Sequence, residues 1–223
     1  MQLVIGNKNY SSWSMRPWVL MKQLGIPFEE VKLRLDLEEG SAFRQGVAMH
    51  SPARTVPVLV DEGFAVWDSL AITEYLAEKH PAVWPAQPQH RARARSLAAE
   101  MHAGFGALRS HCPMNIEARL PEVGARIWAE QPAVQRDVAR IEAAFSNALA
   151  TSNGPFLFGD FCAADAFFAP VCTRLLTYAL PVSSTTRDYL QRVVAAPGVA
   201  AWIRESLAEQ DFIDFDEPYR KSR

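Results

Sequence analysis

The hydrophobic pattern of the first 80 residues alternates between strands and helices. The short apolar run 3–5 predicts a strand, and the mostly apolar run 18–24, which stops at Gly25, predicts a buried helix. Apolar residues at every second position then predict a second strand within 28–35, and the polar stretch 36–46 is expected to hold a loop and a short helix.

Residues 58–67 predict a β-hairpin, followed by a helix that Asp68-Ser69 caps. The runs 58–60 and 64–67 are typical of strands, and Asp61-Glu62-Gly63 between them is typical of a tight turn. Two strands joined by a helix should be parallel, whereas a hairpin pair is antiparallel. We therefore expect an α/β unit with a four-stranded mixed sheet and helices on its faces.

Beyond this unit the strand signals nearly vanish. The proline-rich segment 81–88 is typical of a linker, and Trp84 is expected to anchor it against a domain. The following apolar stripes predict helices: 94–108, 138–149, the almost wholly apolar 163–176, a helix that Pro197-Gly198 ends, and 199–207. The expected organisation is an α/β domain at 1–80, a linker at 81–88 and an all-α domain at 89–223. The tail from residue 212 onward is expected either to fold back over a cleft or to be mobile.

Composition and charge exclude several classes of function. The formal net charge is −2, so no basic face for nucleic acid is expected. No run approaches the length of a membrane span, and no signal-peptide pattern begins the sequence. The three cysteines are not paired as Cys-x-x-Cys, and the five histidines lack ligand spacing. A reducing, cytoplasmic compartment and no metal site are expected.

The candidate chemistry begins in the turn before the first helix, at Tyr10-Ser11-Ser12-Trp13-Ser14-Met15-Arg16-Pro17-Trp18. Free backbone N–H groups and the positive end of the helix dipole favour an anion there. Proline is tolerated best in the first turn of a helix, so the helix is expected to begin near Trp13 or Ser14, with Ser11 and Ser12 in the turn before it. The alternative is that one serine is a plain N-cap and the others are surface loop.

Three further segments carry local signals. Arg54-Thr55-Val56-Pro57 places a proline just before a strand, where a cis Val56–Pro57 bond is tolerated and an ordinary trans bond is the alternative. A cis bond would turn the Val56 backbone outward to pair with an extended peptide. Asp68-Ser69 at a helix N-terminus suits a carboxylate or is a plain cap. In the stretch 159–165, Asp165 is expected to accept hydrogen bonds from the turn before its helix, a structural role.

Together these residues resemble the glutathione transferase superfamily, along the whole chain. The resemblance implies a thioredoxin-like N-terminal domain, an all-helical C-terminal domain and glutathione as co-substrate. It also implies that Val56-Pro57 binds the cysteinyl backbone of glutathione, that Asp68-Ser69 binds its γ-glutamyl end, and that Arg54 holds its glycyl carboxylate.

The serine turn is most similar to that of the zeta class, the maleylacetoacetate isomerases, whose usual turn is Ser-Ser-Cys-Ser-x-Arg. Ser11 matches the zeta catalytic serine, whereas a theta-like register selects Ser12; Ser11 is the expected catalytic residue and Ser12 the alternative. Trp13 stands at the glutathione site where zeta proteins have cysteine, which removes the obvious thiol for reductive chemistry. Cys162 stands where the helix-opening motif usually has Ser or Thr, and a thiol caps a helix poorly.

The resemblance implies a glutathione transferase that activates glutathione as a thiolate for attack on a small electrophile. A glutathione-dependent isomerase and a non-catalytic glutathione-binding module are the alternatives. Family membership further implies a homodimer. Side chains expected either at the electrophile site or in the core are Trp13, Met101, Phe105, His111 and Met114.

Overall fold

The computed structural model describes residues 1–223. The first third of the chain holds four strands and three helices: β1 Gln2–Ile5, α1 Ser12–Gln23, β2 Glu29–Lys32, α2 Ala42–Ala48, β3 Val58–Asp61, β4 Phe64–Trp67 and α3 Ser69–Lys79. The rest is helical: η1 Pro81–Val83, α4 Pro88–Ala103, α5 Gly106–His111, α6 Pro121–Glu130, α7 Pro132–Thr151, α8 Ala163–Thr177, α9 Ser184–Ala195, α10 Pro197–Glu209 and η2 Asp214–Asp216.

The four strands form one mixed sheet in the order β2-β1-β3-β4. β1 pairs with β2 in parallel and with β3 antiparallel, and β3 pairs with β4 antiparallel. The expected fold class and strand directions are confirmed, although β2 is shorter than the alternation 28–35 predicted.

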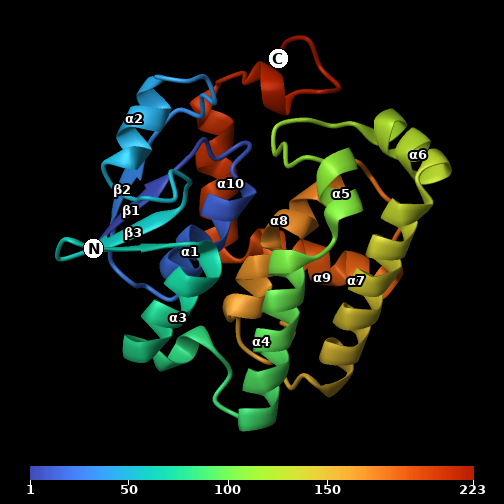
Figure 1. Cartoon of the computed structure of the whole chain (residues 1–223). Coiled ribbons are helices and arrows are strands. Elements are labelled where there is room, and N and C mark those ends of the chain that lie inside the picture. Colours follow the sequence, from blue (N-terminus) through green and yellow to red (C-terminus); the bar gives the residue numbers. More distant parts are fainter.

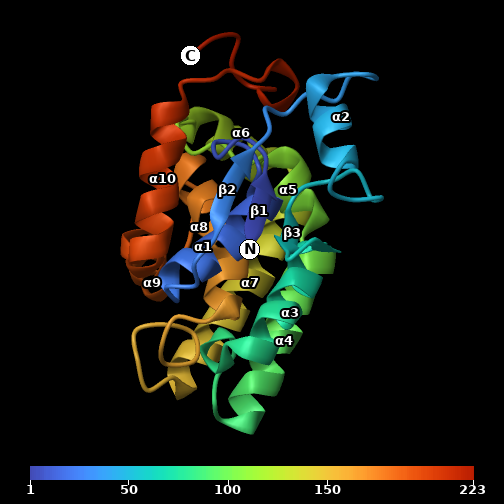
Figure 2. The same cartoon turned by 90° about the vertical axis from the view of Figure 1, so that its left-hand side faces the viewer.

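Alternation along the strands sends successive side chains to opposite faces of the sheet. Val4 and Val58 pack with Phe43 and Val47 of α2 on one face. Leu3, Ile5 and Leu59 face the other way and join the main core beneath α1 and α3. Figure 2 shows α2 set apart from the helices that cover this second face.

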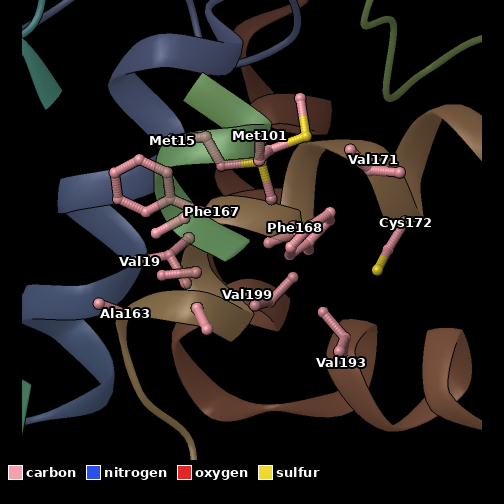
Figure 3. Packing of buried hydrophobic residues seen from close by; sticks show 14 of the residues in the cluster. Met15, Val19, Met101, Ala163, Phe167, Phe168, Val171, Cys172, Val193 and Val199 are labelled. Atoms are coloured by element: carbon pink, nitrogen blue, oxygen red, sulfur yellow. The ribbon is translucent and has the colours of Figure 1, made fainter. Parts of the chain in front are cut away.

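The helix α8 is the centre of the molecule. It packs against α1, α4 and α9, and α1 also packs against α10. Figure 1 shows α8 between the strand-containing part of the chain and α7. Because α8 has neighbours on all sides, its side chains are buried almost throughout, as its apolar sequence predicted. In Figure 3, Phe167 and Phe168 of α8 lie close to Met15 and Val19 of α1 and to Met101 of α4.

Two of the predicted helical segments differ from the structure. The stripe 94–108 is divided, because α4 ends at Ala103 and α5 begins only at Gly106. Between them Phe105 has a left-handed backbone, with φ 55°, which no continuous helix contains. Pro197 ends α9 as predicted but is also the first residue of α10. The missing N–H of a proline costs nothing at that position.

The proline-rich segment and the tail both pack against the rest of the molecule. Within the segment, Trp84 is buried, as expected for an anchor. The tail folds back: Tyr219 donates to the His111 carbonyl oxygen, and Arg220 and Arg223 pair with Glu117. No helix of the chain has both the length and the apolar composition needed to cross a membrane.

Candidate active site

The serine turn opens α1 slightly earlier than predicted. Ser11 is the N-cap residue and Ser12 the first residue of the helix, one residue before Trp13, so Ser12 does not lie in the turn before the helix as expected. Pro17 accordingly lies inside the helix and not in its first turn. The Ser11 side chain makes no capping hydrogen bond. The plain N-cap interpretation therefore does not account for this hydroxyl.

The hydroxyls of the turn have different partners. Ser11 Oγ and Ser14 Oγ are hydrogen-bonded to each other at 2.7 Å, and Ser14 Oγ also accepts from the Gly6 N–H at 3.2 Å. Ser12 Oγ accepts from Arg174 Nη2 at 3.1 Å. Ser11 is therefore tied to its own turn, whereas Ser12 is tied to a residue far along the chain in α8.

Two arginines are buried beside this turn. Arg174 on α8 is 4% exposed and also donates from Nε to the Cys112 carbonyl oxygen, while its Nη1 has no partner. Arg16 on α1 is 1% exposed, and its Nε has no partner either. Burial and the charges of Arg174 and Arg109 lower the pKa of Arg16 to about 9, and burial lowers that of Arg174 to about 10.

Arg16 connects the serine turn to the start of α3. Its guanidinium carbon lies 4.1 Å from the centre of the Trp13 ring, and its Nη1 donates to Ser69 Oγ at 3.4 Å. A guanidinium stacked on an aromatic face is held by a cation–π interaction. The Trp13 ring thus holds the Arg16 guanidinium in the position from which it contacts Ser69.

Asp68 and Ser69 begin α3 as predicted. Asp68 is the N-cap residue, and its Oδ1 accepts from the Leu70 N–H at 2.8 Å. Its backbone is left-handed, with φ 73°. The other carboxylate oxygen lies 3.3 Å from His102 Nε2 of α4. Asp68 is exposed and Ser69 is buried, so only the carboxylate projects from the surface here.

The Val56–Pro57 peptide bond is cis, which confirms that expectation. Pro57 is buried and immediately precedes β3, while Arg54 two residues before Val56 is exposed and has a left-handed backbone. Arg54 forms no ion pair with a carboxylate of this chain.

One cavity of about 620 Å³ brings these segments together. Every site residue predicted from the sequence lines it: Ser11, Ser12, Trp13, Arg54, Val56, Pro57, Asp68 and Ser69. This volume is in the range of small-molecule sites. Its charged lining consists of four arginines (Arg44, Arg54, Arg109, Arg174) and two aspartates (Asp68, Asp216), so the cavity favours a ligand with net negative charge.

The far wall of the cavity was predicted only in part. Met114 lines it, but Met101 and Phe105 lie in the main core and His111 does not reach it. The helical part contributes five residues that sequence reasoning missed: Gly106, Arg109, Ser110, Pro113 and Arg174. Arg174 did carry a signal, because a charged side chain in an otherwise apolar buried helix is rarely buried without a partner or a function.

The tail closes one end of the cavity through Phe215 and Asp216. Tyr10 holds it there, donating to Glu217 Oε1 at 2.7 Å. Burial and the Glu217 hydrogen bond raise the pKa of Tyr10 to about 12, and burial raises that of Asp216 to about 6. Of the two alternatives for the tail, folding back over a cleft is therefore the one observed.

No group of three or more His, Cys, Asp or Glu side chains in the chain has an arrangement that would hold a metal ion. The three cysteines are buried and unpaired. Hydroxyl groups, arginines and the two aspartates are the polar side chains that this cavity offers to a ligand.

Comparison with known proteins identifies relatives along most of the chain. The family model for the glutathione S-transferase N-terminal domain matches residues 10–79. Maleylacetoacetate isomerase of Rattus norvegicus is 30% identical over 162 residues, which span 71% of this chain and 70% of that protein.

Solved structures agree over nearly the full length. A glutathione transferase homologue from Burkholderia, solved with bound glutathione, has a TM-score of 0.69 and 27% identity, covering 93% of this chain and 98% of its own. A maleylacetoacetate isomerase from Methylobacterium extorquens has a TM-score of 0.64 and 23% identity, covering 91% and 95%, and supports the fold alone. The mixed sheet, the helical remainder and the similarity to the rat isomerase lead to one conclusion: this chain belongs to the glutathione transferase family.

Proposed function

We propose that this protein is a glutathione transferase that binds glutathione in the cavity at the start of α1 and holds its sulfur as a thiolate for attack on a small electrophile. The observation that supports this most strongly is the convergence of the serine turn, the cis Val56–Pro57 segment and Asp68-Ser69 on one arginine-rich cavity. These three segments are far apart in the sequence and meet only through the fold.

The charges of the cavity match those of the tripeptide. Glutathione carries two carboxylates and one ammonium group, and Arg54 is free to pair with the glycyl carboxylate. Asp68 projects toward solvent beside Ser69, so its carboxylate can take the α-ammonium of the γ-glutamyl residue while Ser69 and the N-terminus of α3 take its carboxylate. The backbone of Val56, at the cavity wall, pairs with the cysteinyl residue as an added strand would.

Activation of the thiol requires a modest free energy. A thiol with a pKa of about 8.5 is mostly protonated at neutral pH. Lowering its pKa by about two units takes about 2.7 kcal/mol of preferential stabilisation of the anion. One hydroxyl donor, together with the N-terminus of α1, supplies an interaction of this size. The thiol proton passes to solvent, the sulfur forms a bond to the electrophilic carbon, and the leaving group departs with its electron pair.

Titration of enzyme-bound glutathione by its thiolate absorbance tests the proposal. The wild type should show a thiol pKa well below that of free glutathione, and Ser11→Ala and Ser12→Ala test the two candidate hydroxyls. Ser96→Ala on the exposed face of α4 is the control and should not change the titration. If both Ser11→Ala and Ser12→Ala keep the wild-type pKa, the serine assignment is wrong. Retention on immobilised glutathione without turnover would favour the non-catalytic module.

The similarity to rat maleylacetoacetate isomerase favours a second candidate, glutathione-dependent cis–trans isomerisation. The same thiolate would add to a conjugated cis double bond, allow rotation, and leave, so that glutathione is not consumed. A panel containing an aryl halide and a cis-configured conjugated enone separates the two reactions. Conjugation releases halide and consumes glutathione, whereas isomerisation does neither.

We also propose that the protein is a cytoplasmic homodimer. Phe64 and Trp67 on the edge strand β4 are 63% and 42% exposed, and burying such side chains against a second copy is favourable. Three unpaired cysteines suit a reducing compartment, where glutathione is available as the thiol. Light scattering of the purified protein tests the dimer, and cell fractionation tests the compartment.

A further inference from the structure

Arg174 is a charged residue that the proposed binding of glutathione does not use. It lies in α8, whose other side chains are almost all apolar and buried, and it reaches the wall of the cavity. Two of its three guanidinium nitrogens have partners, the Cys112 carbonyl oxygen and Ser12 Oγ, and neither partner carries a charge. Burying a guanidinium without a carboxylate is costly, so the position calls for a compensating anion.

The surrounding charges make this need stronger. The positive charge of Arg109 on α5 disfavours the charged forms of Arg16 and Arg174, and the charge of Arg174 disfavours that of Arg16. None of the three arginines forms an ion pair with a carboxylate. The other titratable groups that face Arg174 are Tyr178, Cys112 and, in the tail, Asp216. Only Asp216 among these is a carboxyl group, and it makes no hydrogen bond to the guanidinium.

The hydrogen-bond inventory separates the two serines. A serine hydroxyl has one hydrogen to donate and two lone pairs to accept. Ser11 Oγ shares a hydrogen bond with Ser14 Oγ, so one of these two hydroxyls donates within the turn, and no arginine donates to either of them. Ser12 uses one lone pair to accept from Arg174, which has no lone pair to offer in return. The hydrogen of Ser12 therefore stays available.

We propose that Arg174 is a positioning residue for Ser12: by donating to Ser12 Oγ it leaves the Ser12 hydroxyl hydrogen for the glutathione sulfur and so makes Ser12, not Ser11, the stronger thiolate donor. A hydroxyl that accepts from a cation is also a stronger donor, because its hydrogen becomes more positive. This inference rests on the proposed function, since it assigns roles at the same site.

The test is a double-mutant cycle read as the pKa of bound glutathione, with Arg174→Gln, Ser12→Ala, the double variant, and Ser11→Ala. Arg174→Gln removes a positive charge near the sulfur and the polarisation of the Ser12 hydroxyl, so it should raise the thiol pKa by about one unit. Ser12→Ala should raise the thiol pKa by a similar amount. The double variant should show no more than the larger single shift, because both changes interrupt one chain of contacts. Ser11→Ala should shift the pKa least. Arg140→Gln is the matched control, since Arg140 pairs with Glu100 on the exposed surface.

The pH profile of turnover separates positioning from structural damage. At a pH above every thiol pKa, Arg174→Gln should recover the wild-type rate, because the sulfur is then ionised without help. A displaced or partly unfolded site would stay slow at every pH. Should Arg174→Gln not fold, the comparison of Ser12→Ala with Ser11→Ala decides, since it leaves Arg174 in place.

The possible outcomes distinguish this inference from the proposed function. An unshifted thiol pKa in the wild type, or no binding of glutathione, overturns the proposed function. Three other results would overturn only the role of Arg174. The lowered thiol pKa could be unchanged in Arg174→Gln, or the pKa shifts of the two single variants could add in the double variant. Ser11→Ala could also shift the pKa more than Ser12→Ala does. A rise in both single variants without further rise in the double supports it.

Discussion

Asp165 is the side chain that holds the start of α8, and we expect its replacement by alanine to destabilise the whole molecule. Its carboxylate is fully buried and accepts three hydrogen bonds: from the Leu157 N–H at 3.1 Å, the Cys162 N–H at 3.0 Å and the Tyr189 hydroxyl at 2.9 Å. Burial raises the pKa of this carboxyl, and the three donors act against that rise. Asp165→Ala leaves all three donors buried without a partner.

The size of the effect follows from these donors. Each buried polar group left unsatisfied costs about 1–3 kcal/mol, and removal of the carboxylate recovers part of its own desolvation cost. We expect the free energy of unfolding to fall by about 4 kcal/mol, the cost of three unsatisfied donors less the desolvation cost that is recovered. Asp165→Asn keeps the shape and one acceptor oxygen but turns an N–H₂ group toward a donor, so its loss should be smaller, about 2 kcal/mol.

Urea unfolding followed by circular dichroism measures both losses. The midpoint should fall in the order wild type, Asp165→Asn, Asp165→Ala, with the slope of free energy against urea unchanged. Asp160→Ala is the matched control, since Asp160 lies in the same loop, is exposed and should change stability by less than about 0.5 kcal/mol. A loss below about 1 kcal/mol in Asp165→Ala at constant slope would refute the reasoning.

Three further predictions concern packing, capping and pH. Gly124→Ala would place a methyl carbon 1.7 Å from the Tyr178 carbonyl oxygen, so we expect a loss of about 3 kcal/mol or more, and an unchanged melting temperature would contradict this. Cys162→Ser should raise stability on the order of 1 kcal/mol in thermal melts, because an oxygen caps better than sulfur; melting unchanged from wild type would count against it. Burial raises the pKa of Glu217, but hydrogen bonds from Arg220 and Tyr10 outweigh burial and leave the pKa lowered. The stabilisation by Glu217 should therefore be complete above its ordinary pKa of about 4.3 and be lost as pH falls through the lowered value. The difference in melting temperature between wild type and Glu217→Gln should shrink over that pH range, and a difference independent of pH would exclude this linkage.

Local signals in the sequence were sufficient for most of the secondary structure. Alternation and apolar runs predicted the strands, and their pairing followed from connection length and handedness. The predictions failed where a local rule met a tertiary constraint. Pro17 sits inside α1, because packing of that helix against α8 and α10 outweighs the loss of one backbone hydrogen bond. Phe105 breaks the stripe 94–108, because its ring is buried in the core from a left-handed backbone that no periodicity reveals.

The residues of the candidate site also fall into those that the sequence predicts and those that only the fold reveals. Ser11, Ser12, Val56-Pro57 and Asp68-Ser69 could be found from the sequence, because a turn, a proline and a helix cap each leave a signature within a few residues. Their convergence on one cavity and the arginines that line it depend on how α8 packs against α1, across more than 150 residues of chain. The sequence alone determined the elements and the family resemblance. Only the tertiary structure decided which hydroxyl meets a buried guanidinium, because that contact joins residues whose separation along the chain carries no local signal.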